Sequence, residues 1–345
     1  MKQNISIHPD FKLNGHSFSE NDLHEMAISL IKDGEPHEKD LGDLMLQWFD
    51  DREYITLKTS GTTGAPKEIK LQKEAMVASA LATGEFFNLQ PRDKALLCLP
   101  ARYIAGKMMF IRAIVLGLEL DFVNPSSHPL QNKEKIYDFV AMVPLQVQQS
   151  LDQLHKVKVL IVGGAQLNDA LKEQLKPLPC KVYETYGMTE TITHIAAKKI
   201  EEPYFSALPH AHLSKDNRGC LVINAPLVNK ETIVTNDLVE MINDTQFQWL
   251  GRFDNVINSG GVKLIPEIIE QKLSEYIPYR FYVIGKDDEL LGKKLVLVIE
   301  HSTYDLVPEI FENLEKFERP KEVLFVEHFK ETPTGKILRK ETIEL

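Results

Sequence analysis

The sequence predicts an α/β protein made of a large domain and a small one. Apolar runs of strand length alternate with helical stretches between residues 54 and 165, which is typical of an α/β domain with a largely parallel sheet. Over residues 219–250 the chain changes to short strands joined by turns, which indicates an antiparallel subdomain. A new set of helices and strands follows Arg252. We therefore expect a large α/β domain over residues 1–252 and a small α+β domain over residues 253–345.

Periodicity places the expected elements along the chain. Apolar residues at helical spacing predict amphipathic helices over residues 23–31 and 41–48. In the large domain, strands are expected at 54–58, 94–100, 139–144 and 157–165, with helices at 75–87 and 108–118. The antiparallel strands are expected at 219–226, 231–242 and 247–251. In the small domain we expect strands at 281–285 and 293–300, and helices at 266–277 and 306–317.

The composition is that of an ordinary globular protein. Of 345 residues, 43% are hydrophobic and 26% are charged, which separates the chain from disordered and fibrous classes. The 40 basic and 50 acidic residues give a net charge of −10, which argues against broad binding to nucleic acid or to an anionic membrane. No apolar run approaches the roughly 20 residues that cross a bilayer. We therefore expect a cytoplasmic protein, and a homodimer stays open.

The most informative segment follows the expected strand at 54–58. Residues 59–67 read TSGTTGAPK, with hydroxyls that can donate hydrogen bonds, glycines that let backbone N–H groups approach an anion, and a terminal lysine. Pro66 stands where a Walker-type loop would require a glycine. A solvated turn is the alternative, but nine such residues in succession favour a phosphate site. Its candidate residues are Thr59, Ser60, Gly61, Thr62, Thr63, Gly64 and Lys67.

This loop resembles the phosphate loop of the adenylate-forming superfamily, which comprises acyl-CoA ligases, luciferases and peptide-synthetase adenylation domains. A second match lies at residues 186–190, which read YGMTE. The resemblance implies that ATP is a substrate, that Thr189 lies near its phosphates and that Glu190 is a ligand of Mg²⁺. One carboxylate beside a triphosphate suits Mg²⁺, because this ion prefers oxygen donors and substrate phosphates. Without the phosphate loop, Glu190 would be interpreted as a carboxylate that caps a turn.

A candidate adenine site lies at the end of the expected strand at 157–165. Gly163, Gly164 and Ala165 close that strand, and their small side chains leave a flat slot in which a planar ring can lie. The resemblance implies that this slot and the ring of Tyr186 enclose adenine. A plain turn at a strand end is the alternative, and both interpretations can hold together.

A candidate ribose contact lies within the expected antiparallel strands. Asp237 follows Thr235 and Asn236 at the place where the superfamily usually has Thr-Gly-Asp. The resemblance implies that Asp237 accepts hydrogen bonds from the ribose hydroxyls. Asn236 departs from the pattern, and we expect it to preserve the turn because asparagine tolerates left-handed backbone angles.

The expected domain junction and the end of the chain carry two more matches. Residues 251–270 match the junction motif of the superfamily over twenty positions. The resemblance implies that Arg252 contacts ribose, that Asp254 is the hinge between two domain orientations, and that Gly261 lies beside the tunnel for the pantetheine of CoA. Lys336 lies in the closing motif, where the family lysine touches the carboxylate and the α-phosphate and neutralises charge that builds up between them. By themselves, Asp254 and Lys336 would be interpreted as solvated surface charges.

The resemblance also bears on the substrate. The phosphate loop begins at residue 59, so we expect a truncated amino-terminal subdomain, with the resemblance covering about residues 54–340. In this compact form the chain is most similar to the bacterial o-succinylbenzoate-CoA ligases of menaquinone biosynthesis. That similarity implies that o-succinylbenzoate is converted to an acyl-adenylate with release of pyrophosphate, and that the acyl group then passes to CoA.

Four residues are candidates for the acyl pocket. Tyr103 stands where many relatives have a gating histidine, which preserves a ring and a polar tip but removes an imidazole. A substrate with two carboxylates needs a cation for the one that is not activated, and Lys107 and Arg112 are candidates. They lie about 140° apart around an ideal helix, so we expect only one to face the pocket. His194 is either a pocket residue or a structural histidine.

Three other functions stay open from the sequence alone. A different aryl- or short-chain acyl-CoA ligase would keep every nucleotide motif. A non-catalytic nucleotide-binding protein on the same scaffold is disfavoured, because Lys67, Glu190 and Lys336 are all present. A peptide-synthetase-like domain is disfavoured because no carrier domain follows Lys336, so free CoA is the expected acceptor.

Overall fold

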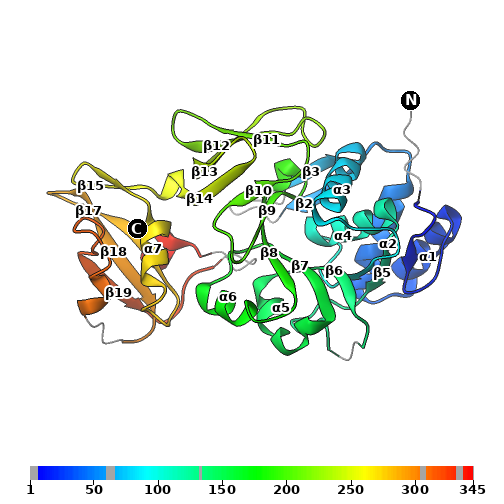
Figure 1. Ribbon diagram of the computed structural model, residues 1–345, viewed down its shortest axis with the longest axis horizontal. Helices are drawn as coiled ribbons and strands as arrows, with labels where there is room; N and C mark the ends of the chain where they lie inside the picture. Colours follow the sequence, from blue (N-terminus) through cyan, green and yellow to red (C-terminus); the bar gives the residue numbers. More distant parts are fainter. Residues whose placement is uncertain (1–6, 60–66, 132–133, 304–307, 332–336, 345) are drawn as a thin grey trace.

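The structure is a computed structural model that describes residues 7–59, 67–131, 134–303, 308–331 and 337–344. They form a twelve-stranded sheet, a five-stranded sheet and a two-stranded hairpin. Figure 1 shows helices α1 to α6 around the larger sheet, and the smaller sheet with α7 at the opposite end of the molecule. This arrangement confirms the predicted α/β class.

The large sheet is parallel in one half and antiparallel in the other. Its strand order is β1-β5-β4-β6-β7-β8-β9-β10-β14-β13-β12-β11. The pairs from β1 to β8 in that order are parallel, and those from β8–β9 onward are antiparallel. The strands are β1 (Lys12–Leu13), β4 (Lys94–Leu97), β5 (Glu119–Phe122), β6 (Tyr137–Met142), β7 (Val157–Val162), β8 (Lys181–Gly187), β9 (His194–Lys199), β10 (Phe205–Ala207), β11 (His212–Lys215), β12 (Cys220–Asn224), β13 (Ile233–Met241) and β14 (Gln246–Arg252).

The predicted antiparallel subdomain is not a separate sheet. Strand β14 pairs with β10, and β10 pairs with β9, so the antiparallel strands continue the parallel half. As a result β13, which contains Asp237, and β8, which contains Tyr186, belong to one sheet although their residues are far apart in sequence.

Helices cover both faces of the parallel half. Along β4 and the residue that follows it, Ala95 and Leu97 pack into one core and Leu96 and Cys98 into another. A strand buried on both faces is apolar along its whole length, which is why this segment gave an uninterrupted apolar run in the sequence. The helical elements here are α1 (Glu20–Asp33), α2 (Pro36–Phe49), α3 (Lys73–Phe87), α4 (Ile104–Leu116), α5 (Pro144–Gln148), α6 (Asp169–Leu175), η1 (Leu151–Lys156) and η2 (Thr189–Thr191).

The second sheet begins five residues after β14 ends, with the 3₁₀ turn η3 (Phe253–Asn255) between them. Its order is β16-β15-β18-β17, with β19 paired to β18, and it has its own apolar core. The division into domains at residues 252 and 253 falls within this interval and stays a prediction. The elements are β15 (Ile257–Ser259), β16 (Val262–Leu264), α7 (Pro266–Leu273), β17 (Phe281–Asp288), β18 (Gly292–Glu300), η4 (Pro308–Phe311), β19 (Glu322–Val326) and α8 (Arg339–Thr342).

One predicted helix is wrong over most of its length. Of the helix expected over residues 306–317, the described part contains only the 3₁₀ turn η4, followed by turns. Ile310 and Leu314 are buried at helical spacing, so periodicity identified the buried face correctly but did not distinguish a helix from successive turns.

In the described part of the chain, no helix has the length and apolar character needed to cross a membrane.

Candidate functional site

The candidate phosphate loop connects the two strands of the hairpin β2 (Tyr54–Thr59) and β3 (Lys67–Gln72). The strands pair along their whole length, and Thr59 is opposite Lys67 where the loop begins and ends. The side chains of these two residues lie outside the described part of the structure, as do Ser60, Gly61, Thr62, Thr63 and Gly64. Their phosphate-binding role therefore stays a prediction.

The candidate adenine slot lies where β7 ends beside β8. The Thr185 hydroxyl donates a hydrogen bond of 3.0 Å to the carbonyl oxygen of Val162. A Cβ atom at Gly163 would approach the same hydroxyl to 2.9 Å, and Gly164 has a φ of +87° that favours glycine. The backbone thus favours glycine at 164, and the nearby Thr185 hydroxyl disfavours a side chain at 163, whether or not a ring binds there.

Tyr186 and Asp237 are brought together by the sheet. The Tyr186 hydroxyl donates a hydrogen bond of 2.6 Å to Asp237, whose other carboxylate oxygen accepts bonds from Trp249 Nε1 at 3.1 Å and Arg252 Nη1 at 3.4 Å. Burial, with the nearby charge of Asp237, raises the pKa of Tyr186, so its hydroxyl remains a donor at neutral pH. Tyr186, from the predicted adenine site, and Arg252, from the predicted ribose site, therefore share one buried carboxylate, that of Asp237.

Asn236 has a different structural role from the one expected. It lies in β13 and its φ is not positive, so the expected left-handed backbone is wrong. Its side-chain amide donates a hydrogen bond of 3.2 Å to Asp254 and its amide oxygen accepts one of 2.9 Å from Arg218. Asp254 lies in η3, is exposed, and is also 3.4 Å from Arg252. The predicted ribose motif and the predicted hinge are therefore in contact.

Thr189 and Glu190 form the short turn η2 directly after β8. The turn is held by the buried Thr191, whose hydroxyl accepts the Met188 N–H at 2.9 Å and lies 2.6 Å from the Thr193 carbonyl oxygen. The next residue, Ile192, has a φ of +63°, a conformation that a β-branched side chain rarely adopts. The hydrogen bonds of Thr191 therefore hold the chain in an unfavourable conformation between Glu190 and β9.

The exposed Glu190 suits a magnesium ion that is also bound by phosphate oxygens. Its backbone carbonyl accepts a hydrogen bond from Asn229, and the residue follows the carboxyl end of β8. Among the described residues there is no group of three or more His, Cys, Asp or Glu that could hold a metal ion by itself. A single protein carboxylate with substrate phosphates is a usual arrangement for Mg²⁺.

Arg112 and His194 form a buried network with Thr83. The Thr83 hydroxyl donates to the Ser79 carbonyl oxygen at 2.8 Å and accepts from Arg112 Nε at 3.3 Å. Since its only hydrogen is committed, its 3.4 Å contact with His194 Nε2 requires Nε2 to be the donor. His194 Nδ1 then accepts from Arg112 Nη2 at 3.4 Å. His194 is therefore neutral, in agreement with a pKa that burial and the Arg112 charge lower well below 6.5.

The Arg112 guanidinium carries a charge that no described residue around it balances. The residue is only 1% exposed, and burial alone lowers its pKa to about 9, so it remains charged at neutral pH. Its hydrogen bonds go to Thr83, His194 and the sulfur of Met109, and it forms no ion pair within the described ranges. A buried cation without an anionic partner is unusual in folded proteins.

Lys107 differs from Arg112 in this respect. Burial lowers its pKa, while the charges of Asp40 and Asp43 on α2 act in the opposite direction. Its charge is thus partly balanced by the amino-terminal helices. Of the two cations expected to serve a second carboxylate, we retain Arg112 as the candidate.

Of the other predicted residues, the structure describes Tyr103 and Gly261, and both are exposed. Tyr103 is the N-cap of α4, is 46% exposed, and has the Arg102 guanidinium 5.1 Å above its ring. Gly261 is in the exposed turn between β15 and β16, with a φ of +82°, and a Cβ atom there would meet no described atom within 4 Å. Lys336 lies outside the described residues, so its role stays a prediction.

Sequence reasoning missed Glu184, which lies two residues before Tyr186 on β8. One carboxylate oxygen accepts the Leu167 N–H at 3.0 Å, and the other is 3.2 Å from Lys172 and 3.3 Å from Lys198. This buried ion pair holds the segment that follows Ala165. The available signal was an acidic residue in an alternating strand, at a position on the same face as the buried Val182.

Comparison with known proteins identifies the class. Residues 45–227 match the family model of the AMP-binding enzyme family, which is more than half of the chain. A crystal structure of an acyl-CoA synthetase (AMP-forming)/AMP-acid ligase II-like protein from Dyadobacter fermentans is 37% identical, with a TM-score of 0.64, over 92% of this chain and 97% of that one. The chain therefore belongs to the AMP-binding enzyme family, as the motifs predicted.

More specific likenesses come from curated relatives. The 2-succinylbenzoate–CoA ligases of Bacillus cytotoxicus and Escherichia coli are both 26% identical, over 83% and 86% of this chain and 69% and 71% of theirs. The fold is also similar to that of o-succinylbenzoate coenzyme A synthetase from Bacillus subtilis in complex with ATP and magnesium, with a TM-score of 0.72 at 19% identity, over 94% of this chain and 82% of that one. The predicted adenylate-forming fold is thus confirmed.

Proposed function

We propose that the protein is an acid–thiol ligase that converts o-succinylbenzoate, ATP and CoA into o-succinylbenzoyl-CoA, AMP and pyrophosphate. The observation that carries the choice of acid is the buried, unbalanced charge of Arg112. Membership of the AMP-binding enzyme family and the likeness to two curated 2-succinylbenzoate–CoA ligases support the reaction class.

The first half-reaction makes a better acylating agent. A substrate carboxylate oxygen attacks the α-phosphorus of ATP, the bond from that phosphorus to the bridging oxygen breaks, and pyrophosphate leaves. Residues 59–67 would bind the phosphates through backbone N–H groups and Lys67. Glu190 would hold Mg²⁺, which when bound offsets phosphate charge. Lys336 would neutralise charge between the carboxylate and the α-phosphate.

The nucleoside would bind at the carboxyl ends of β7 and β8 in the large sheet. Gly163 to Ala165 and the Tyr186 ring would enclose adenine. Asp237 already accepts three hydrogen bonds from protein donors, and a carboxylate can accept about four. A ribose hydroxyl would therefore add to this group or replace the long 3.4 Å contact with Arg252, which could then bind ribose itself.

The second half-reaction transfers the acyl group. The thiol sulfur of CoA attacks the acyl carbonyl carbon, and AMP leaves with the oxygen that came from the acid. Movement about Asp254 would withdraw Lys336 and admit pantetheine beside Gly261, which has no side chain to block it. One site can serve both steps in this way because each step needs a different face of the nucleotide cleared.

Arg112 distinguishes a dicarboxylate from a simple acid. Keeping a guanidinium buried without an anion costs free energy in the absence of substrate, and a bound carboxylate would offset that cost. Thr83, His194 and the sulfur of Met109 each accept one N–H of Arg112. A guanidinium has five N–H groups, so the remaining ones can bind such an anion. Monocarboxylic acids lack the group that would make this contact.

The reaction is tested by pyrophosphate release from ATP and Mg²⁺ with o-succinylbenzoate, with benzoate and short-chain monocarboxylic acids as controls, and with and without CoA. We expect release with o-succinylbenzoate and formation of its CoA thioester only when CoA is present. A clear preference for a monocarboxylic acid would replace this proposal by another aryl- or short-chain acyl-CoA ligase. No AMP formation with any acid would refute both.

A further inference from the structure

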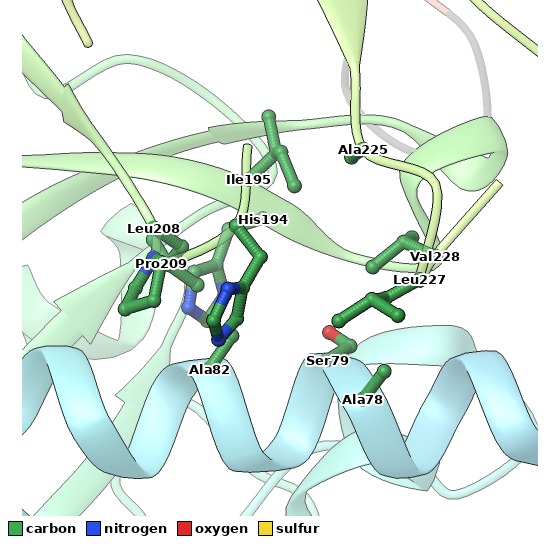
Figure 2. A pocket seen from close by; sticks show the side chains of 11 residues that line it. Ala78, Ser79, Ala82, His194, Ile195, Leu208, Pro209, Ala225, Leu227 and Val228 are labelled. Atoms are coloured by element: carbon green, nitrogen blue, oxygen red, sulfur yellow. The ribbon is translucent and has the colours of Figure 1, made fainter. Parts of the chain in front are cut away.

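A narrow hollow lies between α3 and two loops that follow strands of the antiparallel half. Its cavity volume is about 10 Å³, which leaves room for about one water molecule. Figure 2 shows Ala78, Ser79 and Ala82 on the helix side, Leu208 and Pro209 on one loop, and Leu227 and Val228 on the other. His194 enters from β9, and it is the residue that connects this hollow to Arg112. Apart from the histidines and Ser79, the lining is apolar.

Ser79 is the unexplained group in this lining. It is 2% exposed, and its hydroxyl oxygen has no hydrogen-bond partner among the described residues. Figure 2 shows that oxygen on the side of α3 that faces Leu227 and Val228. A buried hydroxyl without a partner is destabilising, and alanine would fill the same helical position without that cost.

Ser79 is one helical turn from the Arg112 network. It lies four residues before Thr83, so the two side chains are on the same face of α3. The Thr83 hydroxyl is fully used by the Ser79 carbonyl, Arg112 and His194. The face of α3 thus presents one satisfied hydroxyl that holds Arg112 and, among the described residues, one unpartnered hydroxyl beside it.

The polar groups of the proposed substrate can be assigned to this arrangement. o-Succinylbenzoate has one carboxylate to be activated at the phosphates, a second carboxylate for Arg112, and a ketone on the chain that connects them. Of these three groups only the ketone, which is an acceptor and not a donor, has no partner in the proposed function. A free hydroxyl in an otherwise apolar wall is a suitable donor for a neutral carbonyl.

We propose that Ser79 is a specificity-determining residue whose hydroxyl donates a hydrogen bond to the keto oxygen of the acid substrate, bound in the hollow between α3 and the loops at 208–210 and 225–228. This inference rests on the proposed function. Because the hollow is narrow, binding requires its loop walls to move apart, while Ser79 stays fixed on the helix.

The test compares Ser79→Ala with wild type on two substrates. One is o-succinylbenzoate, and the other is 2-(3-carboxypropyl)benzoate, in which the ketone is replaced by methylene and both carboxylates remain. Loss of one neutral hydrogen bond should raise KM for the keto acid by about threefold to tenfold. KM for the methylene analogue and for ATP should not change. Ser79→Ala should also melt at the same temperature as wild type or higher.

Ser150→Ala is the matched control. Ser150 is 1% exposed and its hydroxyl also lacks a partner in the part of the chain that the structure describes, but it precedes η1 and does not line the hollow. It should leave both KM values unchanged. The proposal is overturned if Ser79→Ala leaves KM for the keto acid unchanged, or raises KM for both acids equally. If wild-type protein turns over neither acid, the proposed function fails first and this contact fails with it.

Discussion

Replacing Arg112 by methionine should make the protein more stable and less able to use its substrate. Burial lowers the pKa of Arg112 to about 9, which corresponds to a cost of roughly 5 kcal/mol for keeping the guanidinium charged in the folded protein. Methionine has a similar length and packs in irregular spaces, and it removes this cost. The same change leaves His194 Nδ1 without a donor, which costs about 1–3 kcal/mol. The free energy of unfolding should therefore rise by roughly 2–4 kcal/mol.

The measurement is denaturant unfolding of the ligand-free protein at neutral pH, with pyrophosphate release as the second readout. Loss of a charge-assisted hydrogen bond should raise KM for o-succinylbenzoate by about 10- to 100-fold and leave KM for ATP unchanged. Lys107→Met is the matched control on the same helix, and its effect on stability should be smaller, because Asp40 and Asp43 already balance part of the Lys107 charge. A ligand-free Arg112→Met protein that is less stable than wild type would show that the guanidinium is not an unbalanced charge.

Three further predictions concern pH and the two half-reactions. The pKa of His194 is lowered on folding, so at low pH the unfolded chain binds a proton that the folded protein does not, and stability should fall as pH decreases below 6.5. Between about pH 7.5 and 5.5 the wild-type protein should lose about 1 kcal/mol more of its free energy of unfolding than His194→Asn. Parallel pH profiles of the two proteins would contradict this. Lys336→Ala should abolish adenylate formation in a pyrophosphate assay but spare thioester formation from supplied acyl-adenylate, whereas equal loss of both would refute the division of roles. Gly261→Leu should do the opposite, and unchanged CoA consumption by a folded variant would rule out the tunnel.

Much of the fold follows from local patterns. The strands at β4, β6 and β7 were predicted because a strand buried on both faces must be apolar throughout, and this property is visible in any window of the sequence. The helix at residues 306–317 was wrong for a related reason. Burial of Ile310 and Leu314 at helical spacing is compatible with a 3₁₀ turn and further turns, and periodicity does not separate these cases.

In the candidate site, too, local patterns found some features and missed those that depend on contacts between distant segments. The phosphate loop, the YGMTE segment and the junction motif are contiguous in sequence, so their residues were found before any contact was known. The hydrogen-bond partners of those residues could not be found from the sequence. Asn236 was expected to support a turn, yet it contacts Asp254, and Glu184 was not singled out although it anchors the backbone next to the adenine slot. These contacts depend on strand pairing between distant segments.

The sequence by itself determined the enzyme family, because the motifs at residues 59–67, 186–190 and 251–270 are short contiguous runs whose residue types can be recognised without any knowledge of contacts in space. Only the tertiary structure decided which cation could serve a second carboxylate. Lys107 and Arg112 are both buried on α4, and what separates them is the charge brought near each one by other elements: aspartates from α2 near Lys107, and a neutral histidine from β9 against Arg112. Electrostatic balance is a property of distances in space, which spacing along a chain does not contain.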